Sequence, residues 1–173
     1  QMCIRDSPFS GTPTYRSIEH LPLDQRVEAM SQPDIRAKIL SEDPVKQSTF
    51  PLIHRILFTQ MFRLGSPANY TPSPEESISA MAQNSGVTPQ EMAYDILLEN
   101  QGRGFIYAPL VNYANYTMDA CAEMLDDPYS IMGLGDGGAH VGFILDAGYP
   151  TWLISYWNRT QKRYSCLLYT SPS

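Results

Sequence analysis

The sequence is poor in cysteine, in positive charge and in long apolar runs, and each shortage excludes a class of protein. Three cysteines occur among 173 residues, and no two form a Cys-x-x-Cys pair, which argues against a disulfide framework or a zinc finger. Twelve Lys and Arg against 18 Asp and Glu give a net charge of −6, which argues against binding to nucleic acid or to an anionic membrane. No apolar run approaches the roughly 20 residues that span a bilayer.

What is present resembles an ordinary folded domain. Hydrophobic residues make up 43% of the 173 residues, and a chain of this length can bury a sizeable core. Cys121 falls on the apolar side of a predicted helix. We interpret it as core packing rather than as a nucleophile, because a free cysteine behaves as a small buried hydrophobe.

The two ends of the chain read as one inverted DNA element. Residues 2–6 back-translate as ATG TGT ATA AGA GAC, whose reverse complement is GTC TCT TAT ACA CAT. Read in a shifted frame with three flanking bases added, it becomes TGT CTC TTA TAC ACA TCT, which encodes residues 166–171. The end of a library-preparation transposon, translated by mistake, has this property. We therefore interpret residues 1–7 and 165–173 as sequencing-adapter artefacts and set them aside. Residues 8–164 are then expected to be an internal part of a longer protein.

This interpretation predicts that the native gene differs from the chain at both ends. Sequencing native DNA across the two junctions should replace residues 1–7 and 165–173 with other codons and extend the reading frame on both sides. The same 16 terminal residues in native DNA would refute the interpretation.

The pattern along residues 8–164 predicts helices first and then an alternation of helices and strands. A proline or a capping box marks most of the helix starts, as in Ser73-Pro74-Glu75-Glu76 and Thr88-Pro89-Gln90-Glu91. Helices are predicted over residues 22–30, 33–41, 73–85, 88–102 and 117–125, strands over 104–110 and 129–134, a loop over 64–73, and an apolar element of either kind over 50–62 and 151–157. The alternation predicts an α/β fold with a parallel sheet or a barrel.

The most informative segment is residues 131–140, which read IMGLGDGGAH. An apolar strand ends there at the carboxylate of Asp136, and Gly137 and Gly138 lack a Cβ atom where backbone or substrate must come close. Barrel enzymes keep catalytic groups at the carboxyl ends of strands. A carboxylate in that place can hold a metal or take a proton from water. The alternative is a plain Asp-Gly turn, in which Asp136 serves turn chemistry alone.

The same segment carries a resemblance to a known family. Residues 133–142, followed by Asp146-Ala147 and Pro150-Thr151, resemble the C-terminal part of the N-acyl-D-amino-acid deacylases, within the metal-dependent amidohydrolase superfamily. Further similar segments are residues 15–27, 65–73, 93–99 and 156–159, so the resemblance covers almost all of residues 8–164. The segment around Asp136 is its specific part.

The resemblance implies the C-terminal part of a TIM-type (β/α)8 barrel and a zinc cofactor of one or two ions. It places most metal ligands upstream of this chain, including an early His-x-His. The chain has no His-x-His, and His20 and His54 are isolated, so we interpret both as structural residues. By the same resemblance, Asp136 is the catalytic carboxylate, which accepts the proton of zinc-bound water and passes it to the departing amine. Whether Asp136 also ligates a second metal stays open.

The implied substrate is a small N-acyl amino acid, with the D isomer favoured. Three residues are candidates for binding it: Gly137, His140 and Arg159. His140 would orient Asp136 or meet the substrate carboxylate, and Arg159 would pair with a carboxylate in a bidentate manner. The alternative is that the side chains of His140 and Arg159 are simply exposed to water. The family continues after this arginine with Asp-Arg and a glycine, whereas residues 160–163 read TQKR.

Two other functions stay open as hypotheses. One is a related amidohydrolase that opens a cyclic amide, as dihydroorotase-like enzymes do. The other is a non-catalytic α/β module that binds a ligand through a face rich in tyrosine and tryptophan, although aromatic side chains more often belong to a core. No partner of nucleic acid or membrane is expected. A cytoplasmic location serves as a default, since an internal segment carries no localisation signal.

Overall fold

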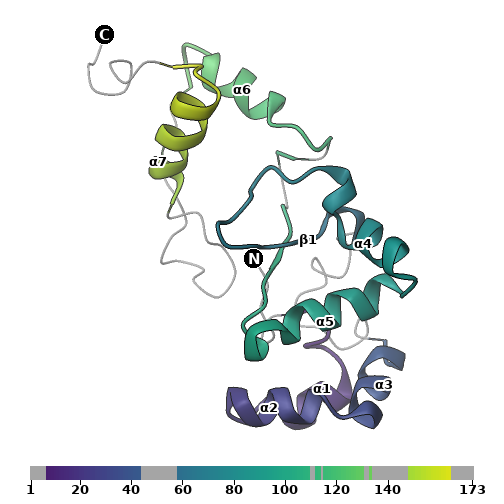
Figure 1. The fold of residues 1–173 in the computed structure, drawn as a ribbon. Coiled ribbons are helices and arrows are strands. Elements are labelled where there is room, and N and C mark those ends of the chain that lie inside the picture. The colour runs from purple at the N-terminus through teal and green to yellow at the C-terminus, as the bar shows by residue number, and fades with distance from the viewer. Residues whose placement is uncertain are drawn as a thin grey trace. The chain divides into compact units, whose positions relative to one another are not determined.

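The computed structural model describes residues 7–43, 58–109, 112–113, 115–130, 133 and 148–164. The chain divides into two units between residues 130 and 131. The first unit contains α1 (Pro13–Ile18), α2 (Leu23–Met30), α3 (Pro33–Ser41), η3 (Phe58–Gln60), β1 (Phe62–Arg63), η4 (Pro74–Glu76), α4 (Ile78–Ser85), α5 (Pro89–Gly102), β2 (Ile106–Tyr107) and α6 (Asp119–Asp126) (Figure 1). The second contains α7 (Tyr149–Trp152) and η5 (Leu153–Thr160).

Most helices begin where the local sequence predicts. The helices predicted over residues 22–30 and 33–41 are confirmed as α2 and α3. At the start of α5, the N–H of Glu91 donates to the Thr88 hydroxyl over 3.2 Å, and the Glu91 carboxylate accepts the N–H of Thr88 over 2.8 Å. This capping box satisfies donors that the first helical turn leaves without partners.

The start of α4 differs from the prediction. The capping box of Ser73 and Glu76 forms, but it closes only the 3-10 turn η4. Ser77 then returns to extended backbone, with φ −65° and ψ 152°, and its hydroxyl accepts the N–H of Ala80 as the true cap of α4. The predicted helix over residues 73–85 is therefore two elements, because a second serine cap follows the first by four residues.

One helix was not predicted at all. The sequence pattern predicted no helix before residue 22, yet α1 begins at Pro13, with Thr12 as its cap. The signal is the same Thr-Pro pair that marks α5. Ser7, which we set aside with the N-terminal end, is buried, and its hydroxyl accepts the N–H of Phe9 over 3.2 Å.

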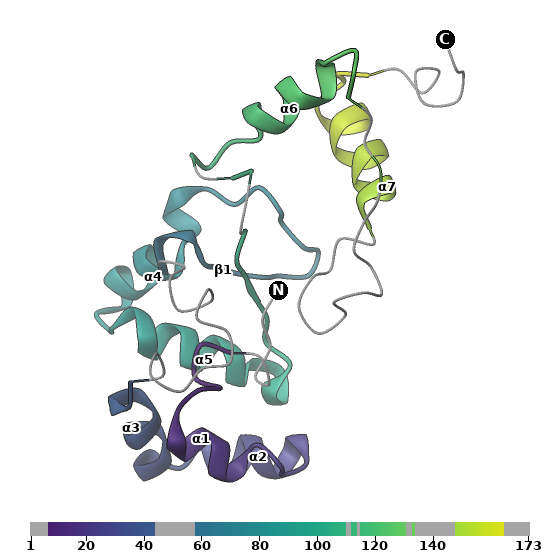
Figure 2. The same ribbon diagram turned by 180° about the vertical axis from the view of Figure 1, so that it is seen from behind.

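The first unit has a core built around α5. Figures 1 and 2 view the chain from opposite sides, and both place α1, α2 and α3 on one side of α5. The buried face of α5 consists of Ala93, Tyr94, Ile96 and Leu97. It packs in one cluster with residues from the other elements: Phe9, Tyr15, Met30, Ile39, Met61, Ile78, Ile106 and Ala108. Each fully buried aliphatic side chain contributes about 1.5–3 kcal/mol to folding.

The strands of the first unit pair in an antiparallel manner. Phe62 of β1 lies opposite Tyr107 of β2, and Arg63 lies opposite Ile106. The alternation of helices and strands in the sequence predicted a parallel sheet, whereas β1 and β2 pair in an antiparallel manner. Two successive helices, α4 and α5, stand between β1 and β2, whereas a single crossover helix joins the parallel strands of a βαβ unit. The predicted barrel stays a prediction.

The strand predicted over residues 129–134 falls mostly outside the described residues. Of its positions, 129, 130 and 133 are described, and Tyr129 lies in a turn with 97% of its surface exposed. In the second unit, the apolar element predicted over residues 151–157 is helical, with α7 running into the wider π-helical turns of η5.

The chain leaves α5 through a left-handed turn. Asn100, Gln101 and Gly102 have φ values of +50°, +60° and +77°, and the N–H of Arg103 closes the turn on the carbonyl of Glu99 over 3.0 Å. Left-handed backbone costs a non-glycine residue about 1–2 kcal/mol. A Cβ atom at Gly104 would collide with the carbonyl oxygen of Ile96, so the return of the chain towards β2 requires glycine there.

The variant Gln101→Gly should therefore raise the free energy of unfolding by about 1 kcal/mol. Glycine relieves the left-handed strain, and its larger entropy in the unfolded chain offsets part of the gain. Urea unfolding followed by circular dichroism measures the change. The control Gln90→Gly, in the regular first turn of α5, should lower stability by up to about 1 kcal/mol. Destabilisation by both variants would contradict a strained turn.

Candidate functional site

The predicted catalytic segment has no structural description. Asp136, Gly137 and His140 lie outside the described residues. Their assignment as a catalytic carboxylate and two substrate contacts therefore stays a prediction from the sequence. Of the candidates, Arg159 alone is described, and it lies on η5 in the second unit.

Arg159 stands in the last turn of η5 and is exposed to solvent. The helix is wide at this point, because the N–H of Gln161 donates to the carbonyl of Tyr156, five residues back, over 2.8 Å. Such π-helical turns occur often at functional sites. The position leaves the guanidinium of Arg159 accessible to an anionic ligand and equally to water, so both interpretations of this residue remain.

The same helix carries a stack of aromatic rings. The rings of Trp152 and Tyr156 lie parallel, with centroids 4.3 Å apart and planes inclined by 7°. Tyr156 also meets Trp157 edge-on at 5.0 Å, and Trp157 is buried. α7 and η5 thus carry three aromatic rings in consecutive contact.

The described residues provide no metal site. Within residues 7–43, 58–109 and the shorter described stretches, no three or more His, Cys, Asp or Glu side chains come together in a way that could hold a metal ion. His20 is exposed just after α1, and His54 lies outside the described residues. The zinc cofactor that the sequence predicts stays a prediction, because the resemblance places most of its ligands outside the described residues.

Cys121 is half-buried on α6, and its Sγ lies 3.8 Å from the carbonyl oxygen of Asn112. Burial raises the pKa of this thiol. A raised pKa keeps the thiol protonated at neutral pH, and the thiolate is the nucleophilic form. The environment therefore does not favour a nucleophile, but the side chain is only half-buried, so the predicted core position of Cys121 is not confirmed.

An aromatic cluster that the sequence did not predict lies beside β1 and β2. We use the name tyrosine cluster for Tyr70, Tyr107, Tyr113 and Tyr116, which gather around Phe62. Edge-on contacts join Tyr70 to Tyr107 at 5.6 Å, Tyr113 to Tyr116 at 6.3 Å, and Phe62 to Tyr116 at 6.3 Å. Phe62 and Tyr107 are opposite each other in the sheet, with ring centroids 6.4 Å apart.

Two hydroxyl groups of the tyrosine cluster donate to backbone carbonyls far away in the sequence. Tyr113 donates to Pro72 over 2.8 Å, and Tyr116 donates to Thr59 over 3.1 Å. Burial, with Tyr113, Tyr70 and Cys121 nearby, raises the pKa of Tyr107 to about 12. The hydroxyl groups of Tyr113 and Tyr116 therefore tie the segment before α6 to the loop before η4 and to η3.

One signal in the sequence points to this cluster in hindsight, and one feature of the backbone accompanies it. Residues 107–116 hold three tyrosines within ten positions. Asn112 and Tyr116 have positive φ values of 64° and 57°, and strained backbone of this kind gathers at functional sites and tight packing alike. Within the first unit, the hypothesis of an aromatic binding face rests on these side chains.

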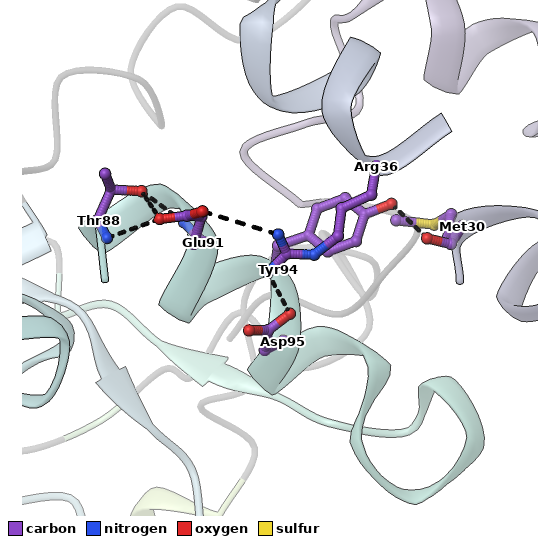
Figure 3. Close-up of polar contacts among 6 residues, drawn as sticks. All are labelled: Met30, Arg36, Thr88, Glu91, Tyr94 and Asp95. Carbon is purple, nitrogen blue, oxygen red and sulfur yellow. Dashed lines mark hydrogen bonds and ion pairs between the residues drawn. The ribbon is translucent and has the colours of Figure 1, made fainter. Parts of the chain in front are cut away.

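A group of polar side chains around Arg36 joins α3 to α5 (Figure 3). The guanidinium of Arg36 pairs with Asp95 over 2.7 Å and with Glu91 over 3.9 Å. Its central carbon lies 5.4 Å from the centroid of the Tyr94 ring. Hydrogen bonds from Thr88, chiefly from its backbone N–H, lower the pKa of the Glu91 carboxyl. The carboxylates of Glu91 and Asp95 are already paired with Arg36, so the group holds helices together rather than offering an acid or a base.

Tyr94 lies at the centre of this group and is fully buried. Its hydroxyl donates to the carbonyl of Met30 at the end of α2 over 2.8 Å. Burial raises the pKa of Tyr94 to about 12, with Arg36 acting in the opposite direction and Asp95 in the same direction. The phenol keeps its proton and its hydrogen bond at every pH below that value.

Comparison with protein-family models, with curated proteins and with solved structures gave no match to this chain. Among the described residues, no helix is both long and apolar enough to cross a membrane.

The raised pKa of Tyr94 predicts that the folded protein loses stability at alkaline pH. An ordinary tyrosine loses its proton near pH 10, so between pH 10 and about 12 the unfolded chain ionises at this residue while the folded chain does not. The free energy of unfolding should therefore decrease as pH rises through this range. Tyr94→Phe should be about 1 kcal/mol less stable at pH 7, because the bond to Met30 is lost, and should show a shallower alkaline decrease.

Urea unfolding at pH 7, 9, 10 and 11 measures both effects. Tyr129→Phe is the matched control, because that ring is 97% exposed, and it should keep the parent stability and the parent slope. An unchanged alkaline slope in Tyr94→Phe would exclude Tyr94 as the buried phenol responsible.

Proposed function

We propose that the chain is the C-terminal part of a zinc-dependent amidohydrolase that removes the acyl group from N-acyl amino acids, the D isomer in particular. The reaction is the hydrolysis of a non-peptide amide bond in a small molecule. The observation that carries the proposal is residues 133–142, which read GLGDGGAHVG and resemble the matching part of the N-acyl-D-amino-acid deacylases. The further similar segments across residues 8–164 support it.

Asp136 is the proton carrier in this proposal. Its carboxylate takes a proton from the water that attacks the amide carbonyl and then gives a proton to the departing amine, acting first as a base and then as an acid. The two glycines that follow, Gly137 and Gly138, leave space at the carboxylate for the substrate or for a close backbone. Proton transfer of this kind accounts for about 10²–10⁴-fold of the rate of an enzyme.

The substrate carries the carboxylate of the amino acid, which acylation of the nitrogen leaves unchanged. Arg159 supplies a permanent positive charge in a planar geometry that suits a carboxylate, and its exposed position at the end of η5 is compatible with that contact. His140 is assigned either to the same carboxylate or to the orientation of Asp136. These assignments are the part of the proposal that distinguishes acyl amino acids from neutral amides.

The metal has to be held largely by residues outside this chain. The described residues contain no cluster of metal-binding side chains, and the full sequence has no His-x-His pair. The proposal therefore assigns the ligands to a part of the enzyme that precedes residue 8, apart from Asp136 if a second ion is present. A bound zinc ion supplies water with a pKa lowered to about 7.

The decisive variant is Asp136→Asn in the intact enzyme, recovered from native DNA with its flanking coding sequence. Loss of the proton carrier should reduce kcat on N-acetyl-D-amino acids by about 10²–10⁴-fold, while the melting temperature stays close to that of the parent. The matched control is Asp119→Asn, the same chemical change at an exposed carboxylate in the first turn of α6, which should retain kcat. Near-normal turnover by Asp136→Asn would refute the assignment.

The 173-residue chain by itself should be inactive. It contributes one catalytic carboxylate without a full set of metal ligands, and the open edges of a partial barrel favour aggregation. The purified chain, incubated with N-acetyl-D-amino acids and added Zn²⁺, should release no free amino acid above the buffer blank. The intact enzyme is the positive control. Zinc-dependent hydrolysis by the chain alone would contradict its interpretation as a partial barrel.

A further inference from the structure

We draw no further inference here: the strongest candidate, the tyrosine cluster beside β1 and β2, is a partly exposed aromatic face, and nothing among the described residues shows what covers it.

Discussion

The first unit depends on the burial of Tyr94 between α5 and the helices that precede it. Removing a large aromatic side chain from a core costs about 3–5 kcal/mol, whereas exposed ion pairs contribute about 0–1 kcal/mol each. Burial of the Tyr94 ring therefore contributes more to stability than the ion pairs do. The pairs of Arg36 with Asp95 and Glu91 orient the group. The bond to Met30 fixes the end of α2 against α5 in the same step. α3 is held through Arg36 and α2 through the phenol.

The path of the chain beyond α5 follows from this packing. α5 is anchored along its buried face, so the chain must reverse direction within a few residues to form β2. It does so through left-handed backbone at Asn100, Gln101 and Gly102 and through the close approach of Gly104 to Ile96. The ion pair of Arg63 with Glu99, over 2.8 Å, links the strand β1 to the point where the helix ends. The strained backbone persists there because the core on one side and the sheet on the other fix both ends of the turn.

The residues predicted to form the site and the groups whose geometry is described are different parts of the chain. The chemistry is assigned to Asp136, Gly137 and His140 by the pattern of residues around them, which lie outside the described residues. The geometry that is described belongs to groups with a supporting character: paired carboxylates, a protonated thiol at Cys121, and phenols whose hydroxyl groups bind backbone carbonyls. Buried groups that already have partners stabilise a fold, and a catalytic group has to keep its reactive atom accessible to a substrate.

By itself, the sequence determined where most helices start and stop. Thr88-Pro89 with Glu91 placed the start of α5, and the helix predicted to end at residue 85 does so, because Gly86 adopts a φ of +68°. These signals act within one helical turn, so the residues alone are sufficient for them. The tertiary structure decided that Ser77 begins α4, that β1 and β2 run antiparallel, and that Arg36 stacks on Tyr94 across 58 positions of the chain. Such pairings depend on which surfaces the folded chain brings together, and no local pattern contains that information.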